Sequence, residues 1–211
     1  KIFTDINTGL FFFLMSNFET TLTRLIQNPR FFLTFLAGSL LCFVPILHFF
    51  AFGYLYRMTK IMRVNGKLEL PDWEDPSLLF IDGIRLTIVL LVYGFLPLTL
   101  GLIIIRLLIS DLSYTSVNVF FGFWNLAVLS LSCSALYRYQ RSQDFYELLN
   151  FTLIFRMALI FFKSNFLVLI LCYGMALIFS PLYGISVFSL LMVALIQSSY
   201  YFYGLDIKGG R

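Results

Sequence analysis

The sequence has 211 residues, of which 60% are hydrophobic, 19% are aromatic and only 12% are charged, and its formal net charge is +4 at pH 7. A soluble domain usually has about twice that charged fraction, because its surface must be hydrated. The composition therefore excludes a soluble enzyme, a disordered tail and a fibrous chain, and it predicts an all-α integral membrane protein.

The basic residues are single side chains scattered along the chain. This argues against a nucleic-acid partner, because phosphate binding needs clustered positive charge. The cysteines lie in apolar stretches without a CxxC spacing, and we expect them to be buried as small hydrophobic side chains. They are Cys42, Cys133 and Cys172. His48 is the only histidine, which argues against a histidine-rich metal site, a bis-histidine haem and a catalytic triad.

The N-terminal segment, residues 1–30, contains an amphipathic pattern. Its apolar positions recur at helical spacing, with polar residues on the other side, as expected of a helix lying in the membrane interface. These positions are Leu14, Phe18, Leu22 and Leu25. Asn28 then suits a helix cap and Pro29 a first helical position.

Residues 31–56 form an apolar run interrupted by Pro45. One helix kinked at Pro45 gives a protein with five spans, whereas a helical hairpin over residues 31–64, turning at Pro45, gives six. In the hairpin, residues 31–44 rise only about 21 Å. That helix must therefore be short, extended at its ends, or re-entrant.

The rest of the chain alternates between polar and apolar segments. We predict an acidic loop over residues 65–85, a central helix pair over residues 86–137, an interfacial segment over residues 138–165 and a C-terminal hairpin over residues 166–204. The whole chain, residues 1–211, is then one membrane domain. Six spans with the N-terminus inside put every basic residue except Arg106 on one side, and the positive-inside rule therefore favours six spans over five.

A weak internal repeat supports the hairpin. Residues 25–33 and residues 160–168 each combine the end of an interfacial helix, a polar break and the start of an apolar helix. Pro45 and Pro181 follow these starts at nearly the same spacing. The layout predicts two similar units that flank the central helix pair.

Three motifs occur in order in the first half of the chain. They are Gly53-Tyr54-Leu55-Tyr56-Arg57, Leu70-Pro71-Asp72-Trp73-Glu74-Asp75 and Asp82-Gly83. Together they resemble the bacterial membrane family called domain of unknown function 4013, with its GY…R helix end, LPEW-acidic loop and D-G pair. Asp72 replaces the commoner Glu, and Pro76 replaces an aromatic residue. The resemblance covers nearly all of the chain after Asn17, and it implies a polytopic membrane protein without catalytic residues to carry over.

The acidic LPxW loop is the first candidate site. Its residues are Glu69, Pro71, Asp72, Trp73, Glu74 and Asp75. One interpretation is a salt-bridged loop that fixes two helices at the interface, with Trp73 as an anchor. The others are a docking surface and a site for a hard cation held by oxygen ligands.

A polar face on the second central helix is the second candidate. Its residues are Asn118, Gly122, Asn125 and Ser132. Helix packing explains such a face, because buried polar side chains and glycine favour close contact between membrane helices. A substrate path is the alternative, and it predicts a hydrophilic cavity lined by Asn118, Asn125 and Tyr93.

The leading functional hypothesis is a non-catalytic accessory, scaffold or assembly subunit of a larger membrane complex, respiratory or photosynthetic. Membrane lipids and other integral membrane subunits are its expected partners, and lipid or pigment is the only bound group we expect. A small transporter or lipid-handling protein is the alternative. A membrane enzyme is the third hypothesis, and it needs paired acids in one pocket. We expect the bacterial inner membrane or a related membrane such as the thylakoid, with both termini on the cytoplasmic or stromal side.

Overall fold

The computed structural model describes residues 23, 26–108 and 114–209. These residues form helices and no strands. The helices are α2 (Pro29–Leu41), α3 (His48–Asn65), α4 (Pro76–Leu90), α5 (Leu96–Leu108), α6 (Tyr114–Ser142), α7 (Phe151–Ile178) and α8 (Tyr183–Gly209). A π-helical segment, η1 (Leu91–Phe95), joins α4 to α5, and a 3-10 segment, η2 (Phe145–Leu149), precedes α7. The interfacial helix predicted within residues 1–30 lies almost entirely outside the described residues.

Within the described part of the chain, four helical segments are long and apolar enough to cross a membrane. They are residues 76–107, 117–142, 151–178 and 183–206. The protein is therefore an all-α, multi-pass integral membrane protein. The prediction of six spans also counted α2 and α3. However, α2 has only 13 residues, and α3 carries Arg57, Lys60 and Arg63, so neither meets the length and charge that a full span requires.

The chain divides into two compact units, which we describe separately. Unit 1 comprises residues 1–85 and 164–211, and unit 2 comprises residues 86–163. All three cysteines are buried and free, as the apolar sequence around them predicts.

In unit 1 the apolar run of residues 31–56 folds as a helical hairpin. α2 ends at Leu41 and α3 begins at His48, and the turn between them contains Pro45. This confirms the hairpin and excludes one kinked helix. Asn28 caps α2 as predicted, because its side-chain oxygen accepts a hydrogen bond from the Arg30 amide at 3.0 Å.

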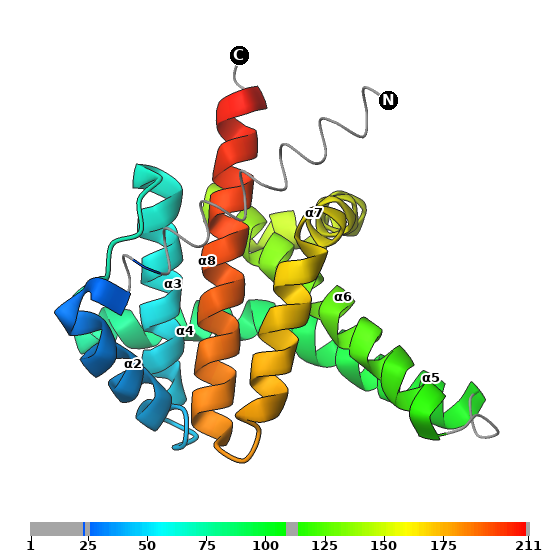
Figure 1. The fold of residues 1–211 in the computed structure, drawn as a ribbon. Helices are drawn as coiled ribbons and strands as arrows, with labels where there is room; N and C mark the ends of the chain where they lie inside the picture. The colour runs from blue at the N-terminus through cyan, green and yellow to red at the C-terminus, as the bar shows by residue number, and fades with distance from the viewer. Residues whose placement is uncertain (1–22, 24–25, 109–113, 210–211) are drawn as a thin grey trace. The chain divides into compact units, whose positions relative to one another are not determined.

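α8 is the central helix of unit 1. It packs against both α2 and α3, and Figure 1 shows it running between these helices and the orange C-terminal part of α7. Gly38 of α2 lies against the Phe188 ring, and Gly184 lies against Phe43 and the Ser39 carbonyl. The turn before α8 therefore lies beside the turn between α2 and α3.

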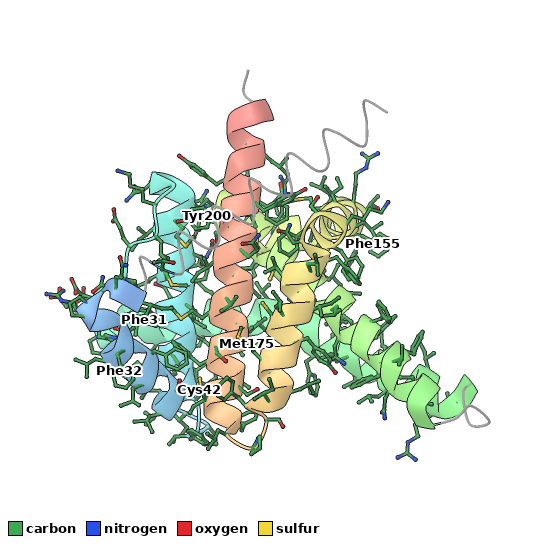
Figure 2. All side chains as sticks on the ribbon, in the orientation of Figure 1. Phe31, Phe32, Cys42, Phe155, Met175 and Tyr200 are labelled. Atoms are coloured by element: carbon green, nitrogen blue, oxygen red, sulfur yellow. The ribbon has the colours of Figure 1, made fainter. Side chains whose placement is uncertain are left out.

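α2 buries its small residues and exposes its large apolar ones. Thr34, Gly38 and Ser39 are buried, whereas Phe32 and Leu40 are exposed. Figure 2 shows Phe32 on the outer side of α2. This pattern is the reverse of a helix at a soluble surface, and it suits a helix whose outer face contacts lipid.

Unit 2 contains the predicted central helix pair, formed by η1, α5 and α6, and the described parts of these elements pack against one another. The Trp124 indole donates a hydrogen bond to the Pro97 carbonyl at 3.0 Å. The Ser130 hydroxyl donates to the Ala158 carbonyl at 2.8 Å and joins α6 to α7.

One segment boundary differs from the prediction. α4 begins at Pro76, so the acidic loop is shorter than residues 65–85, and a proline at the start of a helix favours this beginning. The predicted interfacial segment, residues 138–165, contains the end of α6, η2 and the first half of α7, and Arg138 and Glu147 form an ion pair at 2.6 Å within it. α7 is interrupted at Asn165, whose backbone has the non-helical angles φ −118° and ψ 20°.

Candidate functional site

The site is built on a close crossing of α3 and α4 at Gly53 and Gly83. A Cβ atom on Gly53 would overlap the Leu79 carbonyl, and one on Gly83 would overlap the Phe49 carbonyl. Both glycines therefore allow backbone-to-backbone contact that no other residue permits. The crossing brings Arg57, one turn beyond Gly53, beside Asp82.

Arg57 connects the crossing to the acidic loop. Its Nε lies 3.2 Å from Asp82 Oδ2, while Arg85 Nη1 lies 2.9 Å from Asp82 Oδ1. The other end of the Arg57 guanidinium donates to the backbone carbonyls of Glu74 at 2.9 Å and Asp75 at 3.4 Å. One planar side chain thus holds α4 and the end of the loop together, which uses the fixed fork geometry of arginine.

The loop itself is anchored by an aromatic pair. Trp73 stacks on the buried Tyr54 ring with centroids 4.5 Å apart and planes 17° apart. Arg30 at the start of α2 forms an exposed ion pair with Asp72 at 3.3 Å. Asp75 has a left-handed backbone (φ 54°), a conformation that Asp tolerates better than most residues. The loop is therefore held by its backbone, one indole ring and one carboxylate.

This arrangement leaves most of the loop's charge facing outward. Glu69, Asp72, Glu74 and Asp75 are all exposed, and Arg57 contacts the carbonyls of Glu74 and Asp75 rather than their carboxylates. Among the described residues, no group of three His, Cys, Asp or Glu side chains is arranged to hold a metal ion. The site combines a rigid helix joint, which we call the Arg57 joint (Gly53, Tyr54, Arg57, Trp73, Asp82, Gly83 and Arg85), with an acidic outer surface.

The second predicted set is less closely organised. Asn118 is exposed. The Asn125 amide donates to the Phe121 carbonyl of its own helix at 2.7 Å. Ser132 is buried, donates to the Val128 carbonyl at 3.0 Å, and packs on Gly94 of η1. The structure thus assigns Ser132 to helix packing and brings no second polar side chain to it from this set.

Tyr93, the third residue of the hypothetical cavity, is buried and donates its hydroxyl proton to the Leu148 carbonyl. That bond joins η1 to η2 within unit 2. The hydroxyl is therefore used to hold two segments together, instead of facing Asn118 or Asn125.

One buried polar pair was missed at the sequence level. Gln197 Nε2 donates to Asn165 Oδ1 at 2.6 Å, and both residues are buried. The Ser164 and Tyr201 hydroxyls lie 3.0 Å apart one turn away. The signal was present in Gln197-Ser198-Ser199, because polar residues inside an apolar run seek polar partners.

Comparison with known proteins gives one match. The model of the family described as protein of unknown function (DUF4013) matches residues 36–197. No curated protein and no solved structure matches the chain. The matched range contains every residue of the Arg57 joint, so the residues that carried the resemblance form one structural element. The chain belongs to the DUF4013 family.

Proposed function

We propose that this protein is a non-catalytic accessory or scaffold subunit of a larger complex in the bacterial inner membrane or a related membrane. The observation that carries the proposal is the Arg57 joint, in which the family motifs form a helix crossing and present an acidic surface. A catalytic or transport motif would be expected to leave reactive or polar groups free in a cavity. Here, Arg57 and Asp82 are engaged with each other and with backbone carbonyls.

The acidic loop is the docking element in this proposal. Its exposed carboxylates surround Trp73, and they lie on the same end of unit 1 as Arg30 and Arg57. The positive-inside rule assigns that end to the cytoplasmic or stromal side. Partner subunits concentrate Lys and Arg on this side of the membrane, so a basic loop of another integral subunit has the complementary charge.

Mild detergent extraction from native membranes, followed by native electrophoresis and mass spectrometry, tests this function. We expect defined, stoichiometric partners to migrate with the wild-type chain. The double variant Glu74→Gln/Asp75→Asn should lose them while keeping its fold. It retains both carbonyls that Arg57 contacts, and Asn tolerates the left-handed backbone at position 75.

Lys163→Gln is the matched control, because Lys163 is exposed and lies outside unit 1. It should keep all partners. Retention of every partner by the Glu74/Asp75 variant would reject the loop as the docking element. Migration of the wild-type chain alone would reject the subunit function.

A small transporter or lipid-handling protein is the second candidate. Two helix interruptions favour it: the π-helical η1 and the break at Asn165, since interrupted helices recur in transporters. If the chain migrates alone, solute flux and lipid transfer in liposomes become the decisive measurements. Solute flux or lipid transfer by the wild-type chain, absent from protein-free liposomes, would favour this candidate.

A further inference from the structure

We propose that the two hairpins of unit 1 are re-entrant. Both would enter the bilayer from the side of the acidic loop and end inside the hydrocarbon, so that neither turn reaches the opposite water phase. We call the turns tip 1 (residues 42–47, between α2 and α3) and tip 2 (residues 179–182, between α7 and α8). The inference goes beyond the proposed function, because it concerns how the chain meets lipid and holds with or without a partner subunit.

The acidic loop marks the level at which unit 1 meets water. The Arg30 and Asp72 side chains of its ion pair are 79% and 67% exposed, and two exposed charges are strongly disfavoured in hydrocarbon. Trp73, the next residue, stacks on Tyr54 of α3, and Trp and Tyr favour the membrane interface. Arg57 of α3 contacts the same loop, so the interface crosses α2 near Arg30 and α3 near Arg57.

From this level the first hairpin is too short to cross the bilayer. α2 has 13 residues and rises about 20 Å at about 1.5 Å per residue. The distance along α3 from Arg57 to His48 is about 14 Å by the same measure. The hydrocarbon core is about 30 Å thick, so tip 1 ends about 10 Å short of its far side.

The second hairpin reaches the same depth, so in this proposal the long apolar helices α7 and α8 enter and leave the bilayer on one side instead of crossing it. Gly184, at the start of α8, lies against Phe43 of tip 1, which sets tip 2 beside tip 1. Gln197 lies about 20 Å from Gly184 along α8. Its side chain donates a hydrogen bond to the Asn165 side-chain oxygen of α7 at 2.6 Å. The buried pair Gln197–Asn165 therefore lies at the same depth in the membrane as the charged side chains of Arg30 and Arg57.

Both tips have the side chains of a lipid-embedded surface. The chain carries no Asp, Glu, Lys or Arg over residues 31–56 or over residues 164–205. Phe43, Ile46 and Leu182 are exposed. Contiguous apolar side chains of this size are unfavourable in water and favourable against acyl chains.

Several backbone N–H groups of the tips have the internal partners that hydrocarbon requires. In tip 1 the Phe43 and Val44 amides donate to the carbonyls one turn earlier at 3.1 and 3.3 Å. In tip 2 the Ser180 and Leu182 amides donate in the same way at 3.2 and 2.8 Å. Pro45 and Pro181 have no N–H to satisfy.

Site-directed spin labelling of the full chain in liposomes tests the proposal. In a background with the three cysteines changed to alanine, single cysteines are introduced as Ile46→Cys and Leu182→Cys, with Lys60→Cys as the control. Lys60 is exposed and lies beyond Arg57 on the water side of the level defined above. We expect the tip labels to be more accessible to oxygen than to a water-soluble nickel complex, with the reverse at position 60.

Thiol labelling from each side of the vesicle decides the depth. A membrane-impermeant maleimide should label both tips at least about tenfold more slowly than position 60, whichever side it is added to. Fast labelling from the side opposite to position 60 would overturn the proposal, because the tips would then emerge. Fast labelling from the same side would also overturn it, because the hairpins would not be inserted. Val44→Cys and Phe179→Cys repeat the test if the first pair of variants does not fold.

Discussion

Gly53 and Gly83 face each other across the crossing of α3 and α4, and each lies so close to the opposite backbone that a methyl group fits on neither. This contact sets the position of Asp82 relative to Arg57. The ion pair of the joint and the course of the loop both depend on it.

We expect Gly53→Ala or Gly83→Ala to destabilise the protein by about 2 kcal/mol or more, because overpacking of a rigid contact forces the backbones apart. Thermal unfolding in detergent, followed by loss of monodispersity on size exclusion, measures the effect. Gly174→Ala is the matched control, since a Cβ there has no neighbour within 4 Å. Equal melting temperatures for the Gly53 and Gly174 variants would contradict the close crossing.

Asp82→Asn is expected to destabilise unit 1 by about 1–3 kcal/mol. It leaves two half-buried arginines without their shared carboxylate. Arg57→Lys should be similarly harmful, because an ammonium group cannot hold a carboxylate and two carbonyls in one plane. The comparison is Arg30→Gln, which removes only an exposed pair and should change stability little. A harmless Arg57→Lys would show that the guanidinium fork is not required.

Gly101→Ala should destabilise unit 2, because a Cβ at that position would overlap the Trp124 ring. The effect should shrink in a Trp124→Leu background, which removes the ring. A double-mutant cycle on thermal stability gives the coupling, and we expect about 1–2 kcal/mol. Strict additivity of the two substitutions would mean that the two side chains do not touch.

The buried amide pair gives a further prediction. Gln197→Leu should cost about 1–3 kcal/mol by leaving the Asn165 side chain without the hydrogen bond that it accepts at 2.6 Å. Gln197→Glu should cost more at neutral pH, since a carboxylate accepts and cannot donate to the Asn165 oxygen. Ser189→Ala, in the same helix, removes only a bond to its own helix and serves as the control. A Gln197→Leu variant as stable as the wild type would rule out this bond as a support of α8.

The sequence predicted the elements whose signals are local. Pro45 and Pro181 mark the two turns, Asn28 marks the cap of α2, and the uncharged runs mark the central pair. It did not predict which charges meet. Asp82 and Arg57 lie 25 positions apart, and their contact depends on the crossing at Gly53 and Gly83, which no periodicity reveals. Six spans were predicted, whereas four helical segments of the described residues have the length and hydropathy of a full span. Hydropathy and the positive-inside rule assign sides to helices, but they do not give depth.

The contacts of Arg57 with Glu74 and Asp75 involve main-chain atoms only. Every amino acid supplies the same carbonyl, so the side chains at these two positions take no part in the bonds that hold the loop. Position 75 still favours Asp, Asn or Gly because its backbone is left-handed, whereas position 74 has no such constraint. The charge and size of the side chain at position 74 can therefore change without weakening the scaffold beneath it, which makes this position a natural place to alter the binding surface of the fold.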